Sequence, residues 1–167
     1  ARVALVGYGP SLQETWPLIK TGRFDAIWTV SKAHDFLIER GITPTHHTDT
    51  DYREHKVAYN KKFLTEIRYM MATQVHPTYL DVLQGKNVSL FHVMNAGTYH
   101  GHYFKTPVTF DSGLQTALLA FELGYREQEW FGMDASIRGE ATHAGPHEGV
   151  RPKENVQVEI AGKLFTM

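Results

Sequence analysis

The densest group of potential ligand side chains is the run of residues 46–51, in which two histidines precede Thr-Asp-Thr-Asp. In a β-strand, alternate side chains point to opposite faces, so His47, Asp49 and Asp51 would share one face. His46 would then lie on the other face. Two carboxylates at this spacing could hold Mg²⁺ or Mn²⁺ against a diphosphate, because hard cations prefer oxygen ligands. Asp-x-Asp also occurs in polar loops. Asp49 and Asp51 are therefore candidate magnesium ligands, with a direct contact of Asp49 to a ribose or substrate as the alternative.

A second candidate site is the turn Gly7-Tyr8-Gly9-Pro10-Ser11, which follows a short run of Val, Ala and Leu. The pattern predicts a buried parallel strand, a tight turn and a helix. Such a turn presents backbone N–H groups and a helix N-terminus at the carboxyl edge of a sheet, where open α/β folds bind anionic ligands. Leu12 replaces the third glycine of a dinucleotide-binding motif, and the sequence has no GxxxxGKS/T phosphate-binding motif. A tight strand–helix turn without a ligand is the competing interpretation.

The helix after this turn would begin at Ser11, because Ser11 and Glu14 match a capping box. Glu14 would place a carboxylate at the positive end of the helix, which disfavours a diphosphate there and favours a ribose, a base or a single phosphate. Pro17 would remove a backbone hydrogen bond, so we expect a short first turn and a restart near Thr15.

Histidines in two predicted loops are candidates for proton transfer, because the unperturbed pKa of histidine is ~6.5. His100 and His102 follow the predicted fifth strand, while His143 and His147 lie in the last long loop. Any of them could be a general base, and the competing interpretation is that they are solvated loop residues. A histidine-based metal site in these loops is an alternative, but zinc would need further ligands.

Strands and helices that would position these residues alternate along the chain, which favours a mainly parallel sheet with helices on both faces. We expect strands at the opening residues and near 25–31, 45–51, 65–71, 87–93 and 129–133. Helices are expected after Ser11, over 32–40 and 76–83, and from a capping Ser112 to Leu123, with a short polar helix or loop over 53–62. Right-handed crossovers make a doubly wound, Rossmann-like order of 3-2-1-4-5-6 the natural expectation. A C-terminal hairpin would turn at Ala161-Gly162.

The composition fits a single α/β domain. A formal net charge of −1 gives no electrostatic case for nucleic acid or an anionic membrane as partner. The absence of cysteine excludes disulfides and thiolate chemistry and fits a cytoplasmic protein. No apolar run approaches the ~20 residues of a membrane span. We expect one Rossmann-like nucleotide-binding domain over residues 1–167, either complete or a fragment of a longer chain.

Four segments in a characteristic order resemble the 6-hydroxymethylpterin diphosphokinase MptE-like family. They are Gly7-Tyr-Gly-Pro-Ser-Leu12, Arg40-Gly-Ile-Thr-Pro44 leading to Asp49, Ser112-Gly113 opening an Ala/Leu helix, and Gly132-Met-Asp134. The family has a Rossmann-like domain and is similar to motility-accessory glycosyltransferases and to bacterial CMP-sialic-acid-dependent sialyltransferases. The resemblance implies a nucleotide site built from Gly7, Gly9, Pro10, Ser11, Ser31, Asp49, Ser112, Gly113 and Asp134. The pair Ser31-Lys32 departs from the family, whose members commonly carry Asn there.

The resemblance implies a nucleotide-dependent transferase in one of two versions. In a diphosphokinase, Mg²⁺ near Asp49, Asp51 or Asp134 would neutralise an ATP diphosphate while an acceptor hydroxyl attacks. In a glycosyltransferase, the Gly-Pro-Ser loop would hold a CMP- or UDP-sugar and His143 would deprotonate the acceptor, with Asp134 as the second candidate catalytic residue. The alternative to both is a non-catalytic Rossmann-like module, such as one carried by a phage, that binds a ligand or a partner protein.

Overall fold

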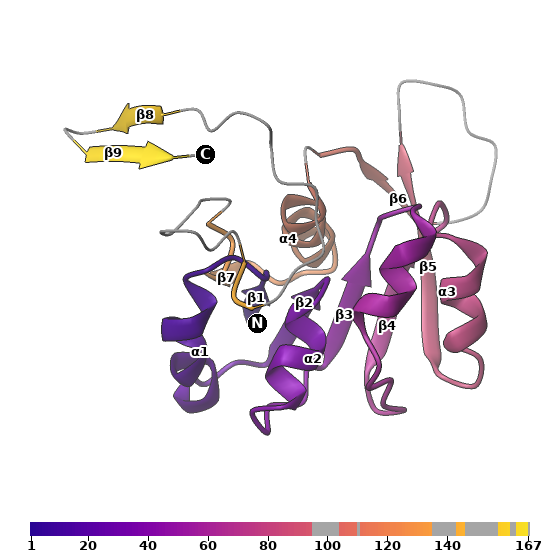
Figure 1. The fold of residues 1–167 in the computed structure, drawn as a ribbon. Coiled ribbons are helices and arrows are strands. Elements are labelled where there is room, and N and C mark those ends of the chain that lie inside the picture. The colour runs from indigo at the N-terminus through magenta and orange to yellow at the C-terminus, as the bar shows by residue number, and fades with distance from the viewer. Residues whose placement is uncertain (95–103, 110, 135–142, 146–156, 161–162, 167) are drawn as a thin grey trace.

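The computed structural model describes residues 1–94, 104–109, 111–134, 143–145, 157–160 and 163–166. Within these residues seven parallel strands form one sheet, and two antiparallel strands form a separate hairpin (Figure 1). The sheet contains β1 (Arg2–Val6), β2 (Ala26–Val30), β3 (His46–Asp49), β4 (Arg68–Ala72), β5 (Asn87–Met94), β6 (Phe104–Pro107) and β7 (Glu127–Phe131). The hairpin consists of β8 (Gln157–Ile160) and β9 (Lys163–Thr166). The predicted α/β class and the predicted hairpin strands are confirmed, and the hairpin's turn lies outside the described residues.

The strand order is β6-β5-β4-β3-β2-β1-β7, so the expected order of 3-2-1-4-5-6 is wrong. From β1 to β6 the chain adds each strand to the same edge, and it then returns to place β7 beside β1, with Val6 opposite Phe131. The rule of right-handed crossovers fixes the face on which a connecting helix lies, but not the direction in which the chain proceeds along the sheet. In addition, β6 lies within the segment 94–111 that the sequence predicts to be one long loop.

Helices cover both faces of the sheet (Figure 1). The elements that connect β1 to β5 are α1 (Leu12–Thr21), α2 (Ala33–Ile38), the 3₁₀ helix η1 (Glu54–Tyr59) and α3 (Pro77–Val82). The return connection contains α4 (Ser112–Glu122). Because this connection runs in the opposite direction, a right-handed crossover puts α4 on the other face.

Packing around β1 reflects the two helical layers. Val3 and Leu5 join a core cluster with Ala117 and Ala120 of α4. Ala4 and Val6 point the other way, into a cluster with Leu12 and Ile19 of α1 and with Phe36 and Leu37 of α2. This alternation buries both faces of β1, as expected for a central parallel strand.

Two expectations about helix α1 are wrong. Ser11 makes no side-chain capping bond within its own helix, so the capping box with Glu14 does not form. The helix also does not restart near Thr15 but runs continuously from Leu12 to Thr21 through Pro17. Bonds on either side of the proline maintain the helix, from Thr15 N to Ser11 O (3.1 Å) and from Gly22 N to Leu18 O (2.8 Å).

Helix α4 differs from the prediction at its start. Asp111, not Ser112, is the N-cap, and its Oδ1 accepts a hydrogen bond from Leu114 N at 2.8 Å. Ser112 is therefore the first helical residue. None of the helices in the described part of the chain is long and apolar enough to cross a membrane.

Candidate functional site

Two cavities lie at the carboxyl edge of the sheet, on either side of the N-terminus of α4. The first, which we name the β1–α4 cavity, has a volume of about 480 Å³. Its lining includes six predicted site residues: Gly7, Gly9, Ser31, Ser112, Gly113 and His143. The second, the β3–α4 cavity, has a volume of about 330 Å³ and shares Asp111 and Ser112 with the first. Four of the predicted residues, Pro10, Ser11, Asp49 and Asp134, line neither cavity.

Glycines are required in the loop after β1 because this loop packs directly against the end of β7. Gly7 N donates to Phe131 O at 2.8 Å, and Gly9 N donates to Gly132 O at 2.7 Å. A Cβ atom on Gly7 would lie 2.5 Å from Gly132 O, and one on Gly9 would overlap the Asp134 carboxylate. Both N–H groups are thus used within the protein. This loop shapes the wall of the β1–α4 cavity without offering these donors to a phosphate.

The N-terminus of α1 is occupied by a carboxylate from across the sheet. Ser11 Oγ donates to Asp134 Oδ1 at 2.7 Å, and Ser11 N donates to Asp134 Oδ2 at 3.1 Å. A negative side chain is stabilising at the positive end of a helix and competes there with any anionic ligand. Glu14 lies in the first turn of α1 as expected, and Asp134 adds a second carboxylate at this helix end. A catalytic role for Asp134 stays a prediction.

The N-terminus of α4 lies between the two cavities. Ser112 and Gly113 lead the helix, and the first N–H groups of a helix have no acceptor within it. Gly113 also allows close packing, because a Cβ there would lie 2.7 Å from Met133 Sδ. The α4 end therefore provides two backbone donors at the point where the two cavities meet.

His143 lies at the wall of the β1–α4 cavity. Its ring packs against the Tyr8 ring with 6.1 Å between the centroids. Burial, followed by the positive charges of Lys32 and Lys56, lowers the pKa of His143 below 6.5. The imidazole is consequently neutral at pH 7, the form that can accept a proton.

Ser31 ends β2 at the same cavity with a backbone φ of +51°, the left-handed region that Asn and Gly adopt more readily than Ser. Lys56, from η1, donates from Nζ to Ser31 Oγ at 3.3 Å and is only 7 % exposed. Sequence reasoning missed Lys56, because it lies in a polar segment with no motif or periodicity to mark it. Its burial depends on the packing of η1 against α3 and on contacts with Ser31 and Asp51, which follow β2 and β3.

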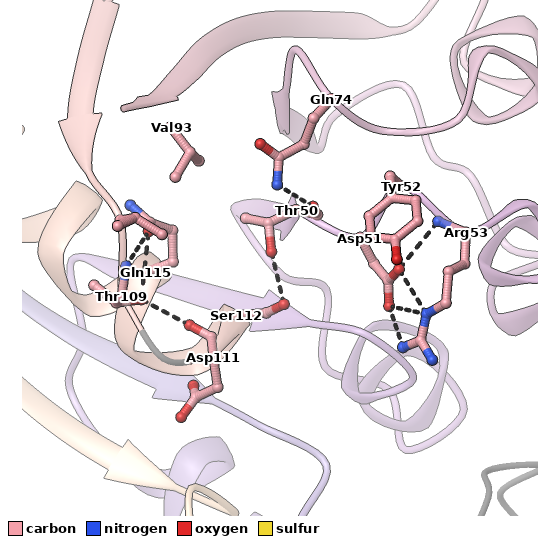
Figure 2. Close-up of a pocket in the computed structure, with 11 residues that line it drawn as sticks. Thr50, Asp51, Tyr52, Arg53, Gln74, Val93, Thr109, Asp111, Ser112 and Gln115 are labelled. Carbon is pink, nitrogen blue, oxygen red and sulfur yellow. Dashed lines mark hydrogen bonds and ion pairs between the residues drawn. The ribbon is translucent and has the colours of Figure 1, made fainter. Parts of the chain in front are cut away.

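The β3–α4 cavity is lined mainly by polar side chains, as Figure 2 shows. A hydrogen bond of 2.8 Å between Thr50 Oγ1 and Ser112 Oγ joins the end of β3 to the start of α4. Gln74 Nε2 donates to Thr50 O at 2.9 Å. On the far side, Gln115 Oε1 accepts from Thr109 N at 3.1 Å (Figure 2). Thr50, Gln74 and Gln115 also escaped the sequence analysis, because hydroxyl and amide side chains are too common in loops to stand out.

The two candidate magnesium ligands have different surroundings, and their role as ligands stays a prediction. Asp51 accepts a bidentate set of hydrogen bonds from Arg53 and lies 3.6 Å from Lys56 Nζ. Burial raises the pKa of Asp51, but the bonds from Arg53 and the charge of Lys56 outweigh it and lower the pKa to about 2. Asp49 is 2 % exposed, and burial raises its pKa. Within the described residues no group of three or more His, Asp or Glu side chains could hold a metal.

The histidines of β3 lie on opposite faces, as strand alternation predicts. His46 stacks on Trp28 at 4.4 Å between ring centroids. His47 is fully buried, where its ring nitrogens contact Thr29 Oγ1 (3.1 Å) and Tyr79 OH (3.2 Å). His100, His102 and His147 lie outside the described residues.

Comparison with known proteins gives a family and solved structures of similar fold. The family model for 6-hydroxymethylpterin diphosphokinase MptE-like proteins matches residues 1–140. The MAf glycosyltransferase from Magnetospirillum magneticum AMB-1 has a similar structure, with a TM-score of 0.73, 17% identity and 99% of this chain covered. A mammalian sialyltransferase gives a TM-score of 0.47 and 16% identity, with 90% of this chain and 61% of that chain covered. No curated protein matches the sequence.

The chain covers only 27% of the length of the glycosyltransferase from Magnetospirillum, so that structure shows the fold of this region and not the activity of the whole protein. The family model covers most of the chain, in the region that contains the seven-stranded sheet. The chain belongs to the 6-hydroxymethylpterin diphosphokinase MptE-like family.

Proposed function

We propose that this chain is the nucleotide-binding domain of a transferase and that the β1–α4 cavity takes the nucleotide. The observation that carries the proposal is the position of this cavity, at the carboxyl edge of a parallel sheet and against the start of α4. Open α/β folds bind nucleotides in this place, and the volume of about 480 Å³ is within the range of small-molecule sites.

Each wall of the cavity has a distinct part in the proposal. The N–H groups of Ser112 and Gly113 would face the phosphate, with support from the charge of Lys32, which also lowers the pKa of His143. Tyr8 and the exposed Trp130 offer aromatic surface to the base or sugar. Asp111 caps α4 in the same place, so its carboxylate weakens the attraction for an anion.

The β3–α4 cavity would take the acceptor. Its lining of hydroxyl and amide groups suits a hydroxyl-rich molecule, and it meets the first cavity at Ser112. An acceptor hydroxyl would attack the transferred group, the bond to the nucleotide would break, and the hydroxyl proton would pass to the neutral imidazole of His143.

Of the two transferase versions, we infer nucleotide-sugar transfer. The carboxylate of Asp51 is already paired with Arg53 and Lys56, and Asp49 is buried and lines neither cavity, so both are less accessible to the Mg²⁺ that diphosphate transfer uses. The fold shared with a glycosyltransferase is compatible with this version. Magnesium dependence and a cytoplasmic location stay predictions.

The first test is isothermal titration of the chain with CMP, UDP, ATP and GTP, each with and without Mg²⁺. We expect binding of CMP or UDP without Mg²⁺, and at 100 times its Kd the ligand should stabilise the fold by about 2.7 kcal/mol. Binding of ATP only with Mg²⁺ would instead support the diphosphokinase. If none of the four binds, both versions are wrong.

A matched pair of variants tests the role of α4. Ser112→Pro deletes one backbone donor at the first helical position, where proline is well tolerated. The preceding residue Asp111 has φ −148° and ψ 168°, a conformation compatible with a following proline. Ser112→Ala removes the same hydroxyl but keeps the N–H group. We expect S112P to bind the nucleotide about tenfold more weakly than S112A, and equal affinities would exclude α4 as the phosphate site.

Turnover separates an enzyme from a binding module. His143→Gln should keep nucleotide affinity and lose the release of nucleotide from a nucleotide-sugar. A wild-type chain that binds a nucleotide-sugar without releasing nucleotide, with or without an added acceptor, would favour the non-catalytic module.

A further inference from the structure

Ser31 is the one residue other than glycine that has a positive φ in the described part of the chain. Its φ of +51° places it in the left-handed region, which serine rarely adopts because its Cβ crowds the backbone. Such conformations persist where the surrounding structure holds them. Because Ser31 lines the β1–α4 cavity, whatever holds it also shapes that cavity.

Lys56 contacts the side chain of Ser31. Its Nζ donates to Ser31 Oγ at 3.3 Å, lies 3.6 Å from the Asp51 carboxylate and stands 4.7 Å from the centre of the Tyr59 ring. A lysine that is 7 % exposed is unusual, since burial of an ammonium group is unfavourable unless it is paired. Lys56 lines neither cavity, so its ammonium contacts the back of the wall rather than the space within.

Asn60 contacts the backbone of Ser31. With its amide oriented to satisfy its neighbours, Nδ2 donates to Ser31 O at 3.1 Å and Oδ1 accepts from Tyr79 OH at 2.9 Å. Asn60 is 2 % exposed and Tyr79 is fully buried in α3. Ser31 is thereby held at its hydroxyl by Lys56 and at its carbonyl by a chain of bonds anchored in the core.

We propose that Lys56, assisted by Asn60, is a positioning residue that holds Ser31 in its left-handed conformation and so sets the nucleotide affinity of the β1–α4 cavity. The inference rests on the proposed function for its ligand, but not for its geometry. Lys56 acts through Ser31 and not by contact with the nucleotide.

The test combines Lys56→Met with Ser31→Asn. Asparagine adopts the left-handed region more easily than serine, so it should depend less on the hydrogen bond from Lys56. We expect K56M to weaken the binding of CMP or UDP about tenfold by titration, the effect of one lost hydrogen bond to a charged group. The double variant S31N/K56M should recover most of that loss. Lys61→Met, an exposed lysine of the same segment, is the control for net charge and should bind as the wild type does.

Two results would overturn the inference. If K56M binds as tightly as the wild type, Lys56 does not shape the cavity. If K56M loses affinity and S31N restores none of it, Lys56 acts on the ligand by its charge instead. Should K56M not fold, Lys56→Gln replaces it, with a smaller expected loss because its amide still donates a neutral hydrogen bond, and with the same expected recovery by S31N.

A wild-type chain that binds none of CMP, UDP, ATP and GTP would refute the proposed function and leave this inference testable by stability alone. S31N should then raise the melting temperature of K56M more than it raises that of the wild type. Equal increments in the two backgrounds would mean that Lys56 and Ser31 are uncoupled, and the inference would fail.

Discussion

The N-termini of α1 and α4 arise from similar residues but differ in what they can bind. Each has a glycine and a serine at the carboxyl edge of the sheet: Gly9 and Ser11, separated by Pro10, before α1, and the adjacent Ser112 and Gly113 at the start of α4. At α1 the N–H groups bond to Gly132 and Asp134, while the start of α4 faces two cavities. A Gly–Ser turn is thus evidence of a possible anion site, but what packs against it decides whether that site is open.

The largest expected difference is in the free energy of unfolding, between alanine substitutions of the glycines at the two helix N-termini. Gly7→Ala should destabilise the fold by about 2–3 kcal/mol in urea unfolding, because its Cβ would lie 2.5 Å from a backbone oxygen that cannot rotate away. Gly113→Ala meets the flexible side chain of Met133 and should cost less than about 1 kcal/mol. Equal costs would contradict the view that the α1 turn is the more tightly packed of the two.

The second-largest difference is expected in stability, between substitutions of the carboxylates at the two helix N-termini. Asp134→Asn removes the charge that faces the α1 N-terminus and should cost about 1 kcal/mol at pH 7 and low salt. Asp111→Asn should cost close to nothing, because asparagine caps a helix about as well as aspartate. Urea unfolding of both variants with unchanged m-values measures the difference. A larger loss of unfolding free energy in D111N than in D134N would contradict this prediction.

Nucleotide affinity, in contrast to stability, should change more in D111N than in D134N. Asp111→Asn removes a negative charge from the wall of both cavities and should tighten CMP or UDP binding about threefold. Asp134→Asn should leave affinity unchanged, since Asp134 faces α1. Titration of the two variants tests this, and a stronger effect of D134N would move the phosphate site to α1.

The smallest expected effect is on the pH profile of turnover. The pKa of His143 is lowered by burial and then by Lys32 and Lys56, so the neutral base persists below pH 6.5 and activity is lost only as pH falls through the lowered pKa. Lys32→Met should move this acid limb towards higher pH, because one of the lowering charges is gone. If the acid limb of the pH profile of kcat/KM is unchanged in this variant, His143 is not the titrating group.

Much of the fold follows from local patterns in the sequence. Apolar runs and turn residues place the strands of the sheet, apart from β6, within a few residues of their observed bounds, and alternation in β3 correctly puts His46 and His47 on opposite faces. Strand β6 escaped because Phe104–Pro107 is short and mainly exposed, with no run of apolar residues. The strand order could not be predicted, because strand pairing depends on contacts between segments that are distant in the sequence.

The candidate site, like the fold, could be predicted only in part from the sequence. Family resemblance selected Gly7, Gly9, Ser31, Ser112 and Gly113, and the fold brings these together around one cavity with His143. It did not select Lys56 or Asn60, whose burial against Ser31 depends on how η1 and the residue after it pack against α3 and the end of β2. Nor could spacing reveal that Asp51 pairs with Arg53.

By itself the sequence determined the α/β class, the family and the residues near the carboxyl edge, because apolar periodicity and turn residues act over a few neighbours. Only the tertiary structure decided the strand order, which helix end is open, and which polar side chains are buried. These depend on contacts between residues far apart in the chain: Asp134 reaches Ser11 across β1 and β7, and Lys56 reaches Ser31 from η1.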